Sequence, residues 1–105
     1  MLLSACFKFA LDGAYDRFAD LGRAIKVAHH ADDDKTAAEN FLKACEELCK
    51  ICEIPSPEKY GVDKDRFFEV MDKMADDALD SGSPANTIKK VTKKDIIKIY
   101  KNLWN

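Results

Sequence analysis

The chain has 105 residues, of which 47% are hydrophobic and 34% charged, with a formal net charge of −2. This mixed composition is typical of one folded domain and excludes an intrinsically disordered chain. No basic stripe stands out, which argues against nucleic-acid binding, and no apolar run approaches the roughly 18–20 residues needed to span a bilayer.

Apolar residues recur every three or four positions almost throughout, which predicts an all-α bundle of about five helices without strands. The first helix, 2–11, is apolar nearly all round and is expected to be buried on most sides. Asp12-Gly13 ends it. The second helix covers 14–27. A polar loop, 28–34, follows, and its aspartates can cap the third helix.

The third helix covers 35–52 and ends before Ile54-Pro55, because proline cannot continue a helix. The fourth covers 64–79. The last begins after Thr92, with Asp95 in the capping-box position. The apolar stripes predict these core residues: Phe18, Ile25, Phe41, Cys45, Leu48, Phe67, Met71, Ile97 and Tyr100. On the third helix, the side chains expected to face water are Glu39, Lys43, Glu46, Glu47 and Lys50.

Three cysteines, Cys45, Cys49 and Cys52, have the spacing of the iron–sulfur motif of radical S-adenosylmethionine enzymes. That motif lies in a loop, whereas these residues fall on the apolar stripe of a predicted helix, where cysteine behaves as a small hydrophobe. We therefore expect buried, reduced and metal-free thiols, and a cytoplasmic protein. The iron–sulfur cluster remains an alternative.

The remaining polar clusters predict no site. His29 and His30 are adjacent on a loop beside three aspartates, and adjacent loop residues rarely direct both rings at one ion, so a solvated loop is favoured. A solvated face is likewise favoured for the carboxylates 76, 77 and 80. The chain offers neither a glycine-rich phosphate loop nor a catalytic triad. These patterns predict no catalytic, cofactor-binding or metal-binding residue.

Three stretches together resemble the C-terminal part of iron-containing alcohol dehydrogenases. The first is Gly13 to Ile25, with a tyrosine and small residues before Leu21-Gly22. The second runs from Ile54-Pro55 to Tyr60-Gly61-Val62-Asp63. The third joins the loop 81–87 to a Thr-capped helix that closes with Leu103-Trp104. The order and spacing of these stretches make the resemblance specific.

The resemblance implies that residues 1–105 are a C-terminal helical domain, truncated relative to a family whose members are longer. Their N-terminal half binds NAD or NADP, and one Asp and three His in the helical half hold iron or another divalent metal. None of those ligand motifs matches this chain. His29 and His30 are not followed by glycine, so no metal role is carried onto them.

By the same resemblance the parent enzyme interconverts alcohols and aldehydes or ketones by metal-assisted hydride transfer. This chain would contribute packing, would be inactive alone, and would have the missing nucleotide-binding half as its partner. The residues expected to border the substrate cleft are Gly82, Ser83 and Asn86. The alternative is a free-standing helical interaction module. The apolar first helix also predicts a homodimer.

Overall fold

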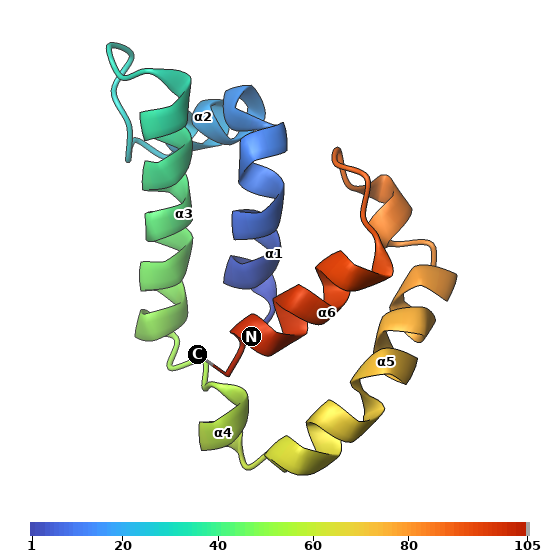
Figure 1. The fold of residues 1–105 in the computed structure, drawn as a ribbon. Helices are drawn as coiled ribbons and strands as arrows, with labels where there is room; N and C mark the ends of the chain where they lie inside the picture. Colours follow the sequence, from blue (N-terminus) through green and yellow to red (C-terminus); the bar gives the residue numbers. More distant parts are fainter. Residues whose placement is uncertain (105) are drawn as a thin grey trace. The chain divides into compact units, whose positions relative to one another are not determined.

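A computed structural model describes residues 1–104, which fold into helices and turns without a strand and so confirm the all-α prediction (Figure 1). Six α-helices and two short 3-10 helices (η) follow one another along this part of the chain. Their bounds are α1 Leu3–Ala10, η1 Leu11–Gly13, α2 Tyr15–Ala24, α3 Asp34–Ile51, α4 Pro57–Tyr60, α5 Lys64–Asp80, η2 Pro84–Asn86 and α6 Lys93–Asn102. The chain divides into two compact units after Ile54.

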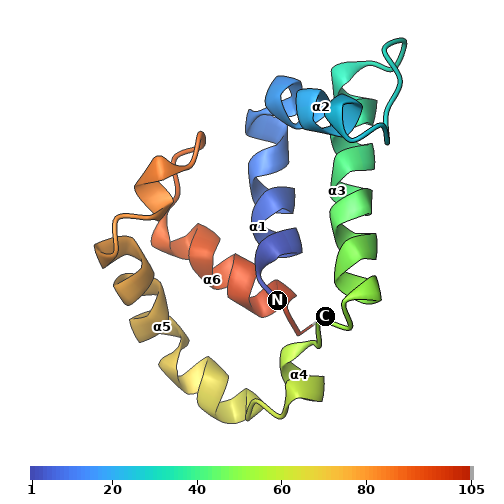
Figure 2. The ribbon, with the colours of Figure 1, turned by 180° about the vertical axis from the view of Figure 1, so that it is seen from behind.

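In the first unit, α1 and α3 run alongside each other while α2 crosses at one end of the pair (Figures 1 and 2). Leu11, Ala38 and Leu42 form the buried centre of this unit. Phe7, Tyr15 and Phe18 pack against this centre, and the rings of Phe7, Phe18 and Phe41 contact one another with centroids 5.5 to 6.1 Å apart. Offset and edge-on ring contacts at such distances add to the stability gained by apolar burial.

Helices α2 and α3 approach each other closely because small residues line their contact. Ala19 on α2 and Ala37 and Ala38 on α3 have no exposed surface. Gly22 completes the contact, since a Cβ atom there would lie 2.7 Å from the carbonyl oxygen of Ala37. This glycine is therefore required by the space between the helices, whatever it costs the helix that contains it.

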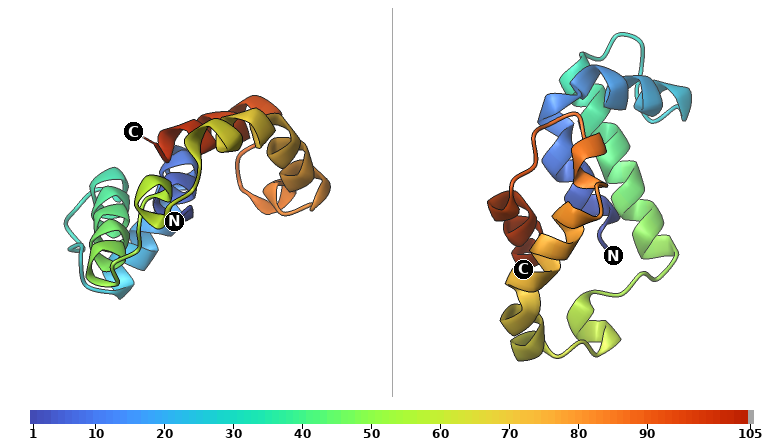
Figure 3. Two further views of the ribbon diagram at one scale, coloured as in Figure 1. Left: turned by 90° about the horizontal axis from the view of Figure 1, so that it is seen from below. Right: turned by 90° about the vertical axis from the view of Figure 1, so that its right-hand side faces the viewer.

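The second unit contains α4, α5, η2 and α6, which are coloured from green to red in Figure 3. Met71 and Ala75 on α5 and Ile96 on α6 are buried. An aromatic contact joins α5 to α6, because the Phe67 ring centroid lies 5.9 Å from that of Tyr100 and 5.3 Å from that of Trp104. The short helix α4 lies between the predicted third and fourth helices, where the sequence predicted no helix. Ser56 caps it and Pro57 occupies its first turn.

Both capping predictions are confirmed. The Asp33 carboxylate accepts a hydrogen bond from the Thr36 backbone N–H at the start of α3, 2.7 Å away. Thr92 and Asp95 form a reciprocal capping box at the start of α6. Side-chain oxygens at these positions satisfy N–H groups that the helix leaves without an internal partner.

Four helices end in a residue with left-handed backbone, and only two of those residues are glycine. Gly61 and Gly82 follow α4 and α5 with φ of 94° and 79°. Lys26 and Glu53 follow α2 and α3 with φ of 63° and 55°. At each non-glycine end the next backbone N–H reaches back to close the helix, from Val27 to Gly22 and from Ile54 to Cys49. These two helix ends therefore carry a steric cost that glycine would avoid.

The prediction that Ile25 and Leu48 lie in the core is wrong. Ile25 is 53% exposed, because α2 ends at Ala24 and the chain turns away. Leu48 is 56% exposed because it lies at the edge of the α3 stripe. Met71 is buried as predicted, while Phe18, Phe41, Cys45, Phe67, Ile97 and Tyr100 are half-buried.

Two further expectations about the first unit are corrected. The first helix was expected to be buried on most sides, but no residue of α1 is fully buried. Glu46 was expected to face water, but it is half-buried and accepts a 3.0 Å hydrogen bond from the Ser4 hydroxyl on α1. No helix among residues 1–104 combines the length and apolar character that crossing a membrane requires.

We expect Gly22→Ala to lower the free energy of unfolding by roughly 1–3 kcal/mol, because the added methyl group must separate α2 from α3. Helix propensity alone predicts the opposite sign, a gain of about 1 kcal/mol. Urea unfolding followed by circular dichroism measures the change. The exposed Ala24→Gly at the end of α2 is the control for propensity. A more stable Gly22→Ala chain would refute the close approach.

We expect Glu53→Gly to raise the free energy of unfolding by roughly 0.5–1 kcal/mol, because glycine adopts the left-handed conformation without a Cβ clash. The same change at Lys43, exposed in the middle of α3, should lower it by about 1 kcal/mol. Parallel urea titrations of both variants test this opposition. If both variants lose stability, the backbone at Glu53 is not left-handed in solution.

Candidate functional site

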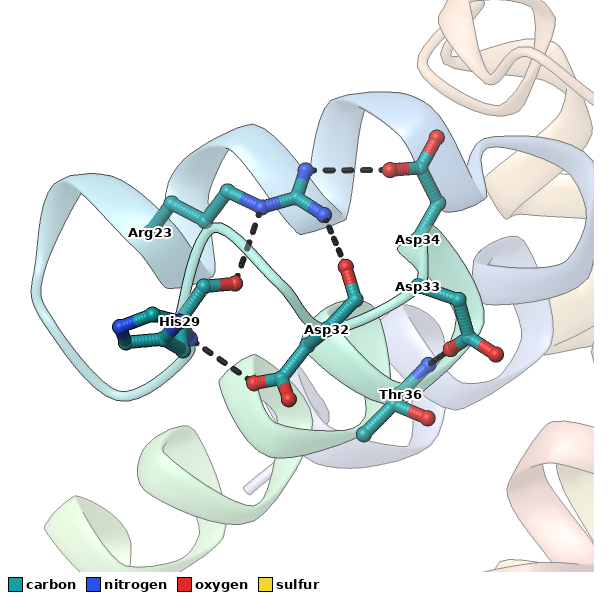
Figure 4. Close-up of polar contacts among 6 residues, drawn as sticks. All are labelled: Arg23, His29, Asp32, Asp33, Asp34 and Thr36. Carbon is teal, nitrogen blue, oxygen red and sulfur yellow. Dashed lines mark hydrogen bonds and ion pairs between the residues drawn. The ribbon is translucent and has the colours of Figure 1, made fainter.

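The loop between α2 and α3 is held by one side chain, Arg23 of α2 (Figure 4). Its Nη1 pairs with Asp34 Oδ1 at 3.0 Å, and its Nη2 donates to the Asp32 carbonyl at 2.7 Å. Its Nε donates to the His29 carbonyl at 3.4 Å. A planar guanidinium suits this arrangement because its donors form a fixed fork. The loop is thus tied to the helix that precedes it.

Both histidines of this loop are exposed, as the sequence predicted. The His29 backbone N–H donates to Asp32 Oδ2 at 2.8 Å, and the Ala31 backbone N–H donates to His29 Nδ1 at 3.1 Å. That second bond occupies a lone pair that a metal would need. The two rings lie 6.1 Å apart in an edge-on arrangement. Within residues 1–104, no three His, Cys, Asp or Glu side chains converge as a metal site would require.

The loop aspartates serve the start of α3. The Asp33 carboxylate accepts hydrogen bonds from Thr36, from its side chain first and then from its backbone N–H, and these bonds hold the pKa of Asp33 below its usual range. A negative charge at a helix N-terminus is also favoured by the helix dipole. Asp34 in the first turn adds a second charge there while it pairs with Arg23. These carboxylates therefore stabilise the start of α3 and its contact with Arg23.

The cysteines are free, and their burial differs from the prediction. Cys45 and Cys49 are half-buried, but Cys52 is exposed because it caps the end of α3, beyond its packed face. Burial first, and then the neighbouring Cys49 and Glu46, raise the pKa of the Cys45 thiol. A raised pKa disfavours the thiolate that nucleophilic attack or iron ligation requires. The expectation of three buried thiols is wrong at Cys52.

The turn after α5 and the short helix η2 contain the residues expected to border a substrate cleft. Gly82, Ser83 and Asn86 are all exposed, and Gly82 has a φ of 79°. The Ser81 hydroxyl organises this turn, since it donates to the Ala78 carbonyl at 2.6 Å and accepts from the Ser83 backbone N–H at 3.3 Å. The Asn86 backbone N–H then donates to the Ser83 carbonyl at 3.1 Å. The loop is locally ordered and presents polar groups to solvent.

The carboxylates at the end of α5 form an exposed face, as predicted. Asp77 pairs with Lys73 one turn earlier at 2.7 Å, and Asp76 pairs with Lys93 of α6 at 3.0 Å. These ion pairs are exposed and individually weak. Their chemistry is that of a solvated helix face.

The residue that sequence reasoning missed is Arg23. A single arginine on an amphipathic helix carries no motif, and its partners are mostly backbone carbonyls. The aspartate-rich loop immediately after α2 is the one pattern that could have indicated a cationic partner nearby.

Comparison with known proteins gives one match. The family model described as "Fe-containing alcohol dehydrogenase family, C-terminal" covers residues 1–104. Neither a curated protein nor a solved structure matches the chain.

We expect Arg23→Met to lower the free energy of unfolding by about 1–2 kcal/mol, because two loop carbonyls and a carboxylate lose a charged donor. Amide hydrogen exchange should accelerate across residues 28–34. Arg66→Met removes an exposed ion pair to Glu69 on α5 and should stay within about 0.5 kcal/mol of the original chain. Unchanged loop exchange in Arg23→Met would show that the network does not order the loop.

Proposed function

The chain belongs to the Fe-containing alcohol dehydrogenase family, as its C-terminal part, and on this premise we propose that it is the helical portion of a dehydrogenase. The parent enzyme would interconvert alcohols and aldehydes or ketones with NAD or NADP as hydride carrier. The observation that carries the proposal is the extent of the match, which covers residues 1–104 of the 105-residue chain.

The described residues do not fit the metal that the family name implies. A divalent ion needs several converging nitrogen or oxygen ligands. The two histidines are exposed on the 28–34 loop, and the Nδ1 atom of His29 already accepts a backbone hydrogen bond. We therefore assign no catalytic step to this chain. We propose that the metal and the nicotinamide cofactor are held by other parts of the parent enzyme.

The nicotinamide cofactor is assigned elsewhere for a similar reason. Pyrophosphate binding uses a glycine-rich turn that leads into a helix N-terminus. The four glycines of this chain are far apart in sequence, at positions 13, 22, 61 and 82. The natural partner of the chain is thus the nucleotide-binding half of the parent enzyme.

The role that remains for this chain is to pack behind the catalytic residues and to shape the cleft. Gly82, Ser83 and Asn86 are suited to border a polar substrate, because the turn that contains them is ordered by hydrogen bonds and exposed. The free cysteines favour a cytoplasmic location, which cell fractionation would test.

A free-standing helical interaction module is the second candidate, and exposed apolar side chains favour it. Leu21 and Ile25 of the α2 segment are about half exposed, and Ile51 at the end of α3 is 71% exposed. Leu2 and Leu3 at the start of α1 are also exposed, which supports a homodimer through the first helix. Such an apolar association should strengthen in high salt, and sedimentation would measure it.

We expect the isolated chain to show no alcohol oxidation with NAD or NADP and ferrous iron, because hydride transfer needs cofactor and metal held together at the reacting carbon. The nucleotide-binding half of a family member, together with the upstream metal-binding helices, should restore turnover when mixed with the chain. Turnover by the chain alone would contradict the proposal. Failure to bind the complementary fragment would favour the interaction module.

In such a reassembled enzyme, we expect Asn86→Ala to change the ratio of kcat/KM between small and bulky alcohols by about 3- to 10-fold, as one pocket contact commonly does. The melting temperature should not change, because Asn86 is exposed. Asn102→Ala, an exposed asparagine at the end of α6, is the matched control. If the original chain, Asn86→Ala and Asn102→Ala all gave the same ratio, Asn86 would not border the substrate cleft.

A further inference from the structure

Helix α6 carries three exposed lysines on one face, which we call the lysine stripe: Lys94, Lys98 and Lys101. Their spacing of four and then three residues places them above one another along the helix. The segment 89–101 contains six lysines and one aspartate, and the helix places these three lysines on one face. Lys93, at the start of α6, instead pairs with Asp76.

Helix α5 carries an acidic stripe with the same spacing: Asp65, Glu69 and Asp72. All three side chains are exposed. Glu69 also pairs with Arg66 at 3.0 Å, but both side chains are more than half exposed, so the glutamate can exchange this partner for another. The two stripes have equal length, because a helix rises by about 1.5 Å per residue.

Each stripe by itself costs helix stability, since like charges three or four residues apart repel each other. The same unit shows the favourable alternative on α5, where Lys73 and Asp77 form a pair one turn apart at 2.7 Å. Alternating signs on α6 would have given similar pairs. Two stripes of opposite sign therefore indicate that each stripe binds a surface of the opposite charge.

The stripes do not face each other within the unit. Helices α5 and α6 meet through apolar residues, with Phe67 against Tyr100 and Trp104 and with Met71 and Ile96 buried. Helical geometry places the lysine stripe opposite the buried Ile96, whereas the acidic stripe lies beside the buried face of α5, because Ala75 follows Asp72 by three residues. All six stripe side chains are exposed, so each stripe can accept a complementary surface from outside this unit.

We propose that the lysine stripe of one copy docks on the acidic stripe of a second copy, head to tail. The matched spacing lets three ion pairs form in register. Several ion pairs together stabilise a contact measurably, whereas a single exposed pair contributes little. A polyanion fits less well, because the acidic stripe lies in the same unit and the chain carries a net charge of −2. The two ends of such an assembly remain free to add further copies.

Sedimentation of the full chain tests this docking. We expect the average mass to rise with concentration in about 20 mM salt, and the dissociation constant to increase at least tenfold in about 300 mM salt, where exposed charges are screened. Reversal of the lysine stripe to glutamate, or of the acidic stripe to lysine, should each abolish association. An equimolar mixture of the two reversed chains should restore it, because each then meets the opposite charge.

The control reverses three exposed lysines outside the stripe, Lys8, Lys35 and Lys43, with the same change in net charge. This control should associate like the original chain, and circular dichroism should show that every variant stays helical. If the chain with glutamate in the lysine stripe does not fold, the neutral variant Lys94→Gln, Lys98→Gln and Lys101→Gln takes its place. This variant should also lose association. A monomer at all concentrations, or association that increases with salt, would overturn the proposal. Failure of the mixture to associate, or salt-sensitive retention on heparin in place of self-association, would do the same.

Discussion

The first unit depends on the close approach of α2 to α3 at Gly22. The carbonyl oxygen of Ala37 lies where any larger residue would place its Cβ atom. The alanines at 19, 37 and 38 have no exposed surface, and Ala38 also packs in the cluster with Leu11 and Leu42. The ring cluster of Phe7, Phe18 and Phe41 then fits around the crossing, because rings and alanines fill complementary volumes.

The loop network follows from that crossing. Arg23 is the next residue after Gly22, so the close contact fixes where its side chain begins. Its guanidinium then reaches two loop carbonyls and Asp34, while Asp33 caps α3. The left-handed backbone of Lys26 reverses the chain between these features. Packing, capping and loop order are thus coupled between Gly22 and Ala37, and the polar groups of this loop form hydrogen bonds that hold the structure.

Within residues 1–104, the His, Cys, Asp and Glu side chains do not gather in threes as a metal site would require. The loop 81–87 and the apolar side chains of α2 and α3 are features that a larger assembly could use. The charge stripes of α5 and α6 are different in kind, since they act through screened electrostatics and not through burial. Salt therefore separates contacts made by the stripes from contacts made by apolar residues.

The sequence by itself determined the helical class, most helix boundaries and both caps, because these depend on residues within a few positions of each other. The family resemblance drawn from three stretches agrees with the match over residues 1–104. Burial was less predictable. Periodicity identifies which face of a helix is apolar, but only the neighbouring elements decide how much of that face is covered, as Leu48 and Cys52 show. The short helix α4 was missed because prolines on both sides of Ser56 suggested a loop. The position of Arg23 and the contact at Gly22 were decided by tertiary structure alone, since both depend on atoms that only the folded chain brings within reach.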